Sequence, residues 1–186
     1  MEKINLKFTE QKSQTYETFK MMSGGTDSNT CIYRSIINQQ QYGLDMNFGT
    51  VLVKSKYNKS CPTTSIMGWC CPYDYHVWNE DDDNIYDSRV AWKKHGIELP
   101  ENPNVVIIDW SNKNFKTLKQ YDNGLKKIIK MMRNSKVDMI YICGLADNAT
   151  LEKIITWDDF EYLISDSCND IQEYTGSTMN NVVEVI

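Results

Sequence analysis

Three continuous apolar runs, separated by segments of helical periodicity, constrain the fold of this 186-residue chain more than any other feature. The runs are 48–53, 104–109 and 137–143, and none alternates between apolar and polar residues. Such runs are typical of strands that are covered on both faces. Between them, apolar residues recur at intervals of three and four over 116–134, and a helix with a polar cap is expected over 28–41. The pattern therefore predicts alternating strands and helices.

This order predicts a three-layer α/β domain with a mostly parallel sheet of four or five strands and helices on both faces. We expect a short buried strand at 17–22 before the first helix. Because acidic residues favour helix N-termini, another helix is expected to begin at Asp81 and to end near Gly96. The stretch 55–80, rich in Cys, Pro, Trp and Tyr, is expected to be a long inserted loop. One domain over 1–186 follows, with a final helix at 157–166 in a short C-terminal part.

The charge and hydropathy of the chain restrict which molecules it is expected to bind. The formal net charge is −5, which argues against nucleic acid as the main ligand because phosphate contacts need a clustered positive field. No run of about 18 apolar residues occurs, so we expect no membrane span. The N-terminus has no apolar signal-peptide core, which favours a cytoplasmic location, and there the six cysteines are expected as free thiols or metal ligands rather than disulfides. Assembly into a homo-oligomer is left open.

The segment SGGTDS, between the first expected strand and helix, is suited to binding phosphate. Its residues are Ser23, Gly24, Gly25, Thr26, Asp27 and Ser28. Two glycines allow a ligand to approach the backbone closely, and hydroxyls and free amides at a helix N-terminus can hold phosphate oxygens. Since Asp27 would repel phosphate on its own, it indicates either a Mg²⁺ site or a helix cap.

This segment resembles the SGGxDS signature of the PP-loop ATP pyrophosphatases, which have a Rossmann-like fold of the HUP class. The following Asn29-Thr30-Cys31 is similar to the Thr-Thr-Cys of the 7-cyano-7-deazaguanine synthases, and 89–109 and 137–144 resemble later elements of the same family. The resemblance implies an ATP- and Mg²⁺-dependent ligase that adenylates a small second substrate and releases pyrophosphate, as in queuosine biosynthesis. The C-terminal part carries only Cys168, so it does not support the zinc site of those synthases.

The resemblance also implies the positions of a nucleotide site. The phosphates would lie over 23–28, with Asp27 and Ser28 as catalytic residues and Asp27 as the metal ligand. Adenine would lie near Val53 and Lys54, and Gly144 and Asp147 would lie opposite. The expected loop at 55–80 would cover the second substrate with Trp69, Tyr75, His76 and Trp78.

Two alternatives stay open. Cys31 at a helix start, with His76 and Asp87, could form the centre of a thiol amidohydrolase or transglutaminase-like enzyme, because a helix N-terminus lowers a thiol pKa and His can act as a base. HVWNE resembles the histidine strand of transglutaminase-like enzymes, and Tyr-His-Val resembles N-terminal glutamine amidohydrolases. Only 11 positions separate His76 from Asp87, which we consider short for that fold, so Cys31 is expected to be a helix-facing residue. The short C-terminal part also suggests a nucleotide-binding protein without turnover.

Overall fold

The computed structural model describes most of the chain up to Gly144 and a few residues beyond it. The described residues are 2–12, 21, 30–59, 67–88, 92–93, 96–113, 115–144, 162, 165–166 and 182–185.

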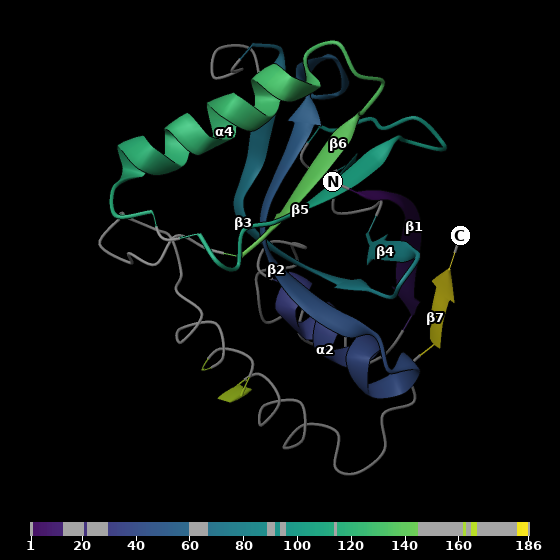
Figure 1. Cartoon of the computed structure of the whole chain (residues 1–186). Helices are drawn as coiled ribbons and strands as arrows, with labels where there is room; N and C mark the ends of the chain where they lie inside the picture. Colours follow the sequence, from purple (N-terminus) through teal and green to yellow (C-terminus); the bar gives the residue numbers. More distant parts are fainter. Residues whose placement is uncertain are drawn as a thin grey trace.

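In this part of the chain, six strands of mixed direction close into a barrel (Figure 1). They are β1 (Glu2–Lys12), β2 (Asp45–Lys54), β3 (Trp69–Glu80), β4 (Asn84–Asp87), β5 (Val105–Asp109) and β6 (Met139–Cys143). The order around the barrel is β4-β3-β2-β6-β5-β1. Strand β1 closes it, because its beginning pairs antiparallel with β5 and its middle pairs parallel with β4. Its end pairs antiparallel with β7 (Val182–Val185), outside the closed ring.

Two helices lie against different parts of the barrel (Figure 1). Helix α2 (Cys31–Tyr42) packs on β2 and β3, and α4 (Leu118–Met132) lies across the outer face of the barrel. The side chain of Thr117 caps α4 by accepting a hydrogen bond from the backbone of Gln120 at 3.2 Å. A single 3₁₀ turn, η1 (Ser55–Tyr57), follows β2.

Alternate residues of β6 contribute to two separate cores. Met139, Tyr141 and Cys143 belong to the cluster inside the barrel, whereas Ile140 and Ile142 belong to the cluster beneath α4. The run is therefore apolar throughout because both of its faces are covered, one by the barrel interior and the other by a helix.

The predicted three-layer parallel fold is wrong, because β2 pairs antiparallel with both of its neighbours, β3 and β6. Among the described strands, the parallel pairs are β5 with β6 and β1 with β4. The strand-helix-strand unit predicted over 104–143 is confirmed as β5, α4 and β6, and the helix predicted at 28–41 is confirmed as α2. A covered barrel strand has the same apolar pattern as a parallel strand, so the pattern alone did not separate the two folds.

Two predictions between 55 and 96 are also wrong. Much of the expected loop is strand β3, and the helix expected from Asp81 is replaced by a turn and strand β4. The Asp81 carboxylate accepts hydrogen bonds from the backbone N–H groups of Asp83 and Asn84, at 3.0 and 2.8 Å. An aspartate that bonds its own following backbone favours a turn, so the acidic run closes a hairpin instead of starting a helix.

Other expected elements lie mostly outside the described residues. Of the strand expected at 17–22, only Met21 is described, and it is helical. Of the helix expected at 157–166, Tyr162, Ser165 and Asp166 are described, and all three are helical.

Gly49 lies in the middle of the barrel wall, paired with His76 on one side and Cys143 on the other. A Cβ atom added there would lie 1.8 Å from the carbonyl oxygen of Ile142, which is backbone and cannot move without disturbing β6. Glycine is therefore required at this position for β2 and β6 to approach each other.

Replacing Gly49 with Ala should lower the free energy of unfolding by about 3 kcal/mol or more, at the upper end of the cost of overpacking. Thermal denaturation measures this as a drop in Tm of roughly 6–12 °C for a chain of this size. Gly43→Ala is the matched control, because Gly43 has a left-handed φ of 65° but open space around it, and it should cost only about 1 kcal/mol. Equal losses in the two variants would contradict the close approach.

Candidate active site

The β3–β4 hairpin brings His76 and Asp87 together. Asn79 pairs with Tyr86 and Glu80 pairs with Ile85, so Asp87 lies across from position 78, on the same face as His76. The His76 ring nitrogen Nε2 lies 2.8 Å from the Asp87 carboxylate oxygen Oδ2. The separation of 11 residues, considered too short in the sequence analysis, is what a tight hairpin produces.

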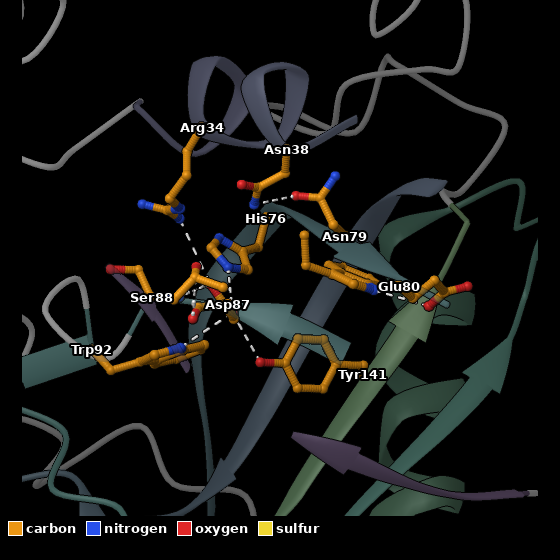
Figure 2. A network of polar contacts seen from close by, with 11 residues as sticks. Arg34, Asn38, His76, Asn79, Glu80, Asp87, Ser88, Trp92 and Tyr141 are labelled. Atoms are coloured by element: carbon orange, nitrogen blue, oxygen red, sulfur yellow. Dashed lines mark hydrogen bonds and ion pairs between the residues drawn. The ribbon is translucent and has the colours of Figure 1, made fainter. Parts of the chain in front are cut away.

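The Asp87 carboxylate is fully buried and accepts hydrogen bonds from several elements (Figure 2). Its Oδ2 atom also accepts from Tyr141 Oη of β6 at 2.8 Å and from Trp92 Nε1 at 3.2 Å. Its Oδ1 atom accepts from the backbone N–H of Ser88 at 2.7 Å. A buried carboxylate with this many donors is held in one orientation and favoured in its charged form.

The pKa values of the pair shift in opposite directions. Burial raises the pKa of Asp87, but the charge and hydrogen bond of His76 outweigh it, so that the pKa lies below its usual range. Burial lowers the pKa of His76, but the charge and hydrogen bond of Asp87, with a smaller contribution from Cys31, raise it to about 9. At neutral pH the centre therefore holds an imidazolium next to a carboxylate.

Cys31 is the first residue of α2 and bonds the same histidine. Because Nε2 faces Asp87, the other ring nitrogen, Nδ1, is left to bond the thiol. Burial raises the pKa of Cys31, but the hydrogen bond and charge of His76, the charge of Arg34 and a hydrogen bond from the Val77 backbone lower it below the ordinary value. The first turn of α2 has no acidic residue, so the positive end of the helix also favours a thiolate.

Helix α2 is fixed to β3 by buried side chains. Asn38 Nδ2 donates to Asn79 Oδ1 at 2.9 Å, and Asn79 Nδ2 donates to the Ser35 carbonyl oxygen at 2.9 Å. One turn nearer the cysteine, Arg34 Nη2 lies 3.6 Å from Asp87 Oδ1 (Figure 2). These contacts hold the helix that carries Cys31 against the strand that carries His76.

Two tryptophans flank the His76 ring. Trp78 is stacked beside it with a centroid distance of 6.3 Å, and Trp92 meets it edge-on at 5.6 Å. Trp78 itself packs edge-on against Tyr141 at 5.0 Å and donates through Nε1 to Glu80 at 3.2 Å. The His76 ring is therefore packed against two aromatic side chains.

Most of the residues predicted to bind ATP lie outside the described part of the chain. Ser23, Gly24, Gly25, Thr26, Asp27, Ser28 and Asp147 lie outside the described residues, as does the side chain of Tyr75. Val53 is buried inside the barrel, and Lys54 pairs with the buried Trp69 and donates to the Ser135 carbonyl oxygen at 3.2 Å. Gly144 follows β6 and donates its N–H to Phe48.

Of the described residues that were predicted to bind ATP or the second substrate, only His76 takes part in the Cys31–His76–Asp87 centre, and Trp78 lies beside it. Lys54 pairs with Trp69, whereas His76 pairs with Gly49, five residues away along β2. At about 3.4 Å per residue the two positions are about 17 Å apart. The structure therefore does not bring Lys54 and Trp69 to the same place as His76.

Three residues of the centre were not predicted from the sequence: Arg34, Trp92 and Tyr141. Arg34 could have been noticed as a cation three positions after Cys31 on a predicted helix. Tyr141 is the one residue with a hydroxyl in an otherwise apolar strand, and a buried tyrosine usually finds a hydrogen-bond partner.

The described cysteines fall into two kinds. Cys31 and Cys143 are free, as expected, whereas Cys70 is disulfide-bonded, so the expectation of free thiols is wrong for that residue. Burial and the charges of Glu80 and Asp109 raise the pKa of Cys143, which leaves it an unreactive thiol at neutral pH.

Comparison with protein-family models, with curated proteins and with solved structures found no match for this chain. Within the described ranges, no three His, Cys, Asp or Glu side chains are grouped so that they could hold a metal ion. Neither of the two described helices is long and apolar enough to cross a membrane.

The charge state of the centre predicts how stability depends on pH. A histidine whose pKa is raised on folding contributes stability that is complete below pH 6.5 and is lost as the pH rises to about 9. In the wild type, ionisation of Cys31 on folding should mask this loss, because a folded protein with a Cys31 thiolate holds one proton on His76 and the unfolded chain holds one on Cys31.

Cys31→Ala should remove the masking. Its free energy of unfolding, measured by urea titration, should decrease above about pH 6.5 with a slope approaching ~1.4 kcal/mol per pH unit relative to the wild type. Cys143→Ala, which removes the other free thiol, should stay parallel to the wild type below pH 8.5. Parallel curves would mean that Cys31 keeps its proton on folding, and curves that are both parallel and flat over this range would mean that His76 is also uncharged in the folded protein.

Proposed function

We propose that this protein is a thiol-dependent acyl-transfer enzyme, an amidohydrolase or a transglutaminase-like enzyme, with Cys31 as nucleophile, His76 as acid and base, and Asp87 as the residue that orients His76. The observation that carries the proposal is the convergence of a thiol of lowered pKa at a helix start, a histidine bonded to it and a buried carboxylate 2.8 Å from that histidine. These are the parts that nucleophilic catalysis by cysteine needs, whatever the fold.

In the first half-reaction, the Cys31 thiolate attacks the acyl carbon of an amide. The developing oxyanion would lie near the backbone N–H of Cys31, because the first N–H groups of a helix have no carbonyl in a preceding turn. The imidazolium of His76 gives its proton to the leaving nitrogen, the C–N bond breaks, and an amine departs. The product is a thioester on Cys31 and a neutral imidazole.

In the second half-reaction, the neutral His76 accepts a proton from water or from an amine as it attacks the thioester. The C–S bond breaks, and the thiolate and imidazolium form again. Asp87 keeps its negative charge throughout and stabilises the imidazolium, which is the role of the carboxylate in such triads.

The predicted ATP-dependent adenylation remains a prediction with less support. The SGGxDS resemblance that implies it also implies a Rossmann-like sheet, and that sheet is not the fold of this chain. The SGGTDS segment lies outside the described residues, and it precedes α2 in the sequence.

The proposal predicts that p-nitrophenyl acetate acetylates Cys31 with a burst of p-nitrophenolate, without ATP. Cys31→Ala should show no burst, and His76→Gln should slow acetylation by about 10²–10⁴-fold. Cys143→Ala should behave like the wild type. The measurements are stopped-flow absorbance and peptide mass spectrometry of the quenched enzyme; adding a primary amine then shows whether water or the amine takes the acyl group.

Two results would contradict the proposal. One is equal acetylation of the wild type and Cys31→Ala, or a label on Cys143 instead of Cys31. The other is release of pyrophosphate from ATP that persists undiminished in Cys31→Ser with no acyl transfer by the wild type, which would favour adenylation.

A further inference from the structure

We propose that Arg34 is a positioning residue that balances the charge of the buried centre, so that Cys31 and His76 rest as an ion pair. The inference deepens the proposed function and depends on it. It stands on three observations: the place of Arg34 on α2, its ion pair with Asp87, and the burial of both side chains.

Geometry places Arg34 near both the nucleophile and the carboxylate. It follows Cys31 by three residues on α2, and residues at this spacing are neighbours on one helix face, with Cβ atoms about 5–6 Å apart. Its Nη2 atom lies 3.6 Å from Asp87 Oδ1, the oxygen that does not bond His76, and the side chains of Arg34 and Asp87 are 4% and 0% exposed. Figure 2 shows the guanidinium extending from the helix toward Asp87.

The net charge of the centre explains the role of Arg34. A resting centre with a thiolate, an imidazolium and a carboxylate carries one net negative charge, and an uncompensated buried charge is costly. The guanidinium of Arg34 stays protonated at any relevant pH and makes the four groups neutral together. Without it, the centre would become neutral by taking up a proton, and the thiolate is the group with the higher proton affinity.

The other groups that face the centre do not supply this charge. Strand β6 contributes the Tyr141 hydroxyl, the 92–93 segment contributes the Trp92 indole, and β1 contributes the Thr9 hydroxyl, which donates to the Asp87 carbonyl oxygen at 3.3 Å. Farther along β3, Glu80 accepts a hydrogen bond from Trp78 and is an anion, so it supplies no positive charge. Among the described residues, the cations beside Asp87 are therefore His76 and Arg34.

The test is the pH profile of Cys31 alkylation by iodoacetamide, an uncharged reagent, with the labelled residue identified by peptide mapping. In the wild type, alkylation should persist well below the pH at which ordinary thiols react. In Arg34→Gln, the acid limb of the profile should move up by about one pH unit or more, the effect of losing an opposite charge at this distance. Arg34→Lys should keep the limb near its wild-type position, and Arg133→Gln, at an exposed arginine on the far end of α4, should not move it.

The variant His76→Gln distinguishes failure of the proposed thiol centre from failure of the role proposed for Arg34. If neither His76→Gln nor Arg34→Gln moves the limb, the proposed thiol centre is wrong. If His76→Gln moves it and a folded Arg34→Gln does not, the thiol centre stands and the role of Arg34 is overturned.

Should Arg34→Gln fail to fold by circular dichroism, Arg34→Lys decides the matter. If the acid limb of the alkylation profile in a folded Arg34→Lys protein moves as far as it does in His76→Gln, the proposed charge-balancing role of Arg34 is wrong. If the acid limb stays within about 0.3 pH unit of its wild-type position, the role of Arg34 is supported, since one pH unit is a tenfold change in the thiolate fraction. The ratio of the alkylation rates by negatively charged iodoacetate and by uncharged iodoacetamide should then also be unchanged.

Discussion

The buried carboxylate of Asp87 is the interaction on which the rest of the centre depends. Strand β3 supplies His76, β6 supplies Tyr141, and the segment after β4 supplies Ser88 and Trp92, all as hydrogen-bond donors to one side chain. These elements lie far apart in the sequence, and the closed barrel brings them together. Because an ionised carboxylate without donors is costly in an apolar interior, each donor is needed for stability as well as for geometry.

This arrangement makes the polar centre part of the hydrophobic core. Trp78, Trp92 and Tyr141 belong to the same buried cluster as Ile85 and Val51, and they also flank or bond the polar groups. Low dielectric strengthens the attraction between His76 and Asp87, and it also raises the cost of any unbalanced charge. The thiol of Cys31, with its lowered pKa, lies at the start of α2, and this helix is tied to β3 by the Asn38–Asn79 contact.

The sequence predicted individual elements better than their arrangement. Helix α4 and strands β5 and β6 follow from strong periodicity and from apolar runs, and they are confirmed. Strand β3 was missed because inner and outer positions are both covered and because Cys, Pro and Tyr suggested a loop. The turn at Asp81 was interpreted as a helix start, since Asp favours both and only its hydrogen bonds to Asp83 and Asn84 separate them. That error hid the hairpin register that brings Asp87 onto the same face as His76.

The three residues of the thiol centre were recognisable by type, but their proximity was not. Cys31 at a predicted helix start and a histidine followed by an aspartate suggested the chemistry, whereas the contacts of Arg34 and Tyr141 with Asp87 join elements that are distant in the sequence. Local patterns do not encode the pairing of β1 with β4, in which Asn5 meets Asn84 across 79 positions of sequence.

The most direct test of the account is the protonation state of His76, observed by ¹⁵N NMR of its ring nitrogens across pH and assigned with His76→Gln. The account predicts that both nitrogens carry protons at pH 7, that they titrate with a pKa of about 9 and that Asp87→Asn lowers this value. A neutral ring at pH 7, titrating at or below 6.5 in the wild type, would contradict it.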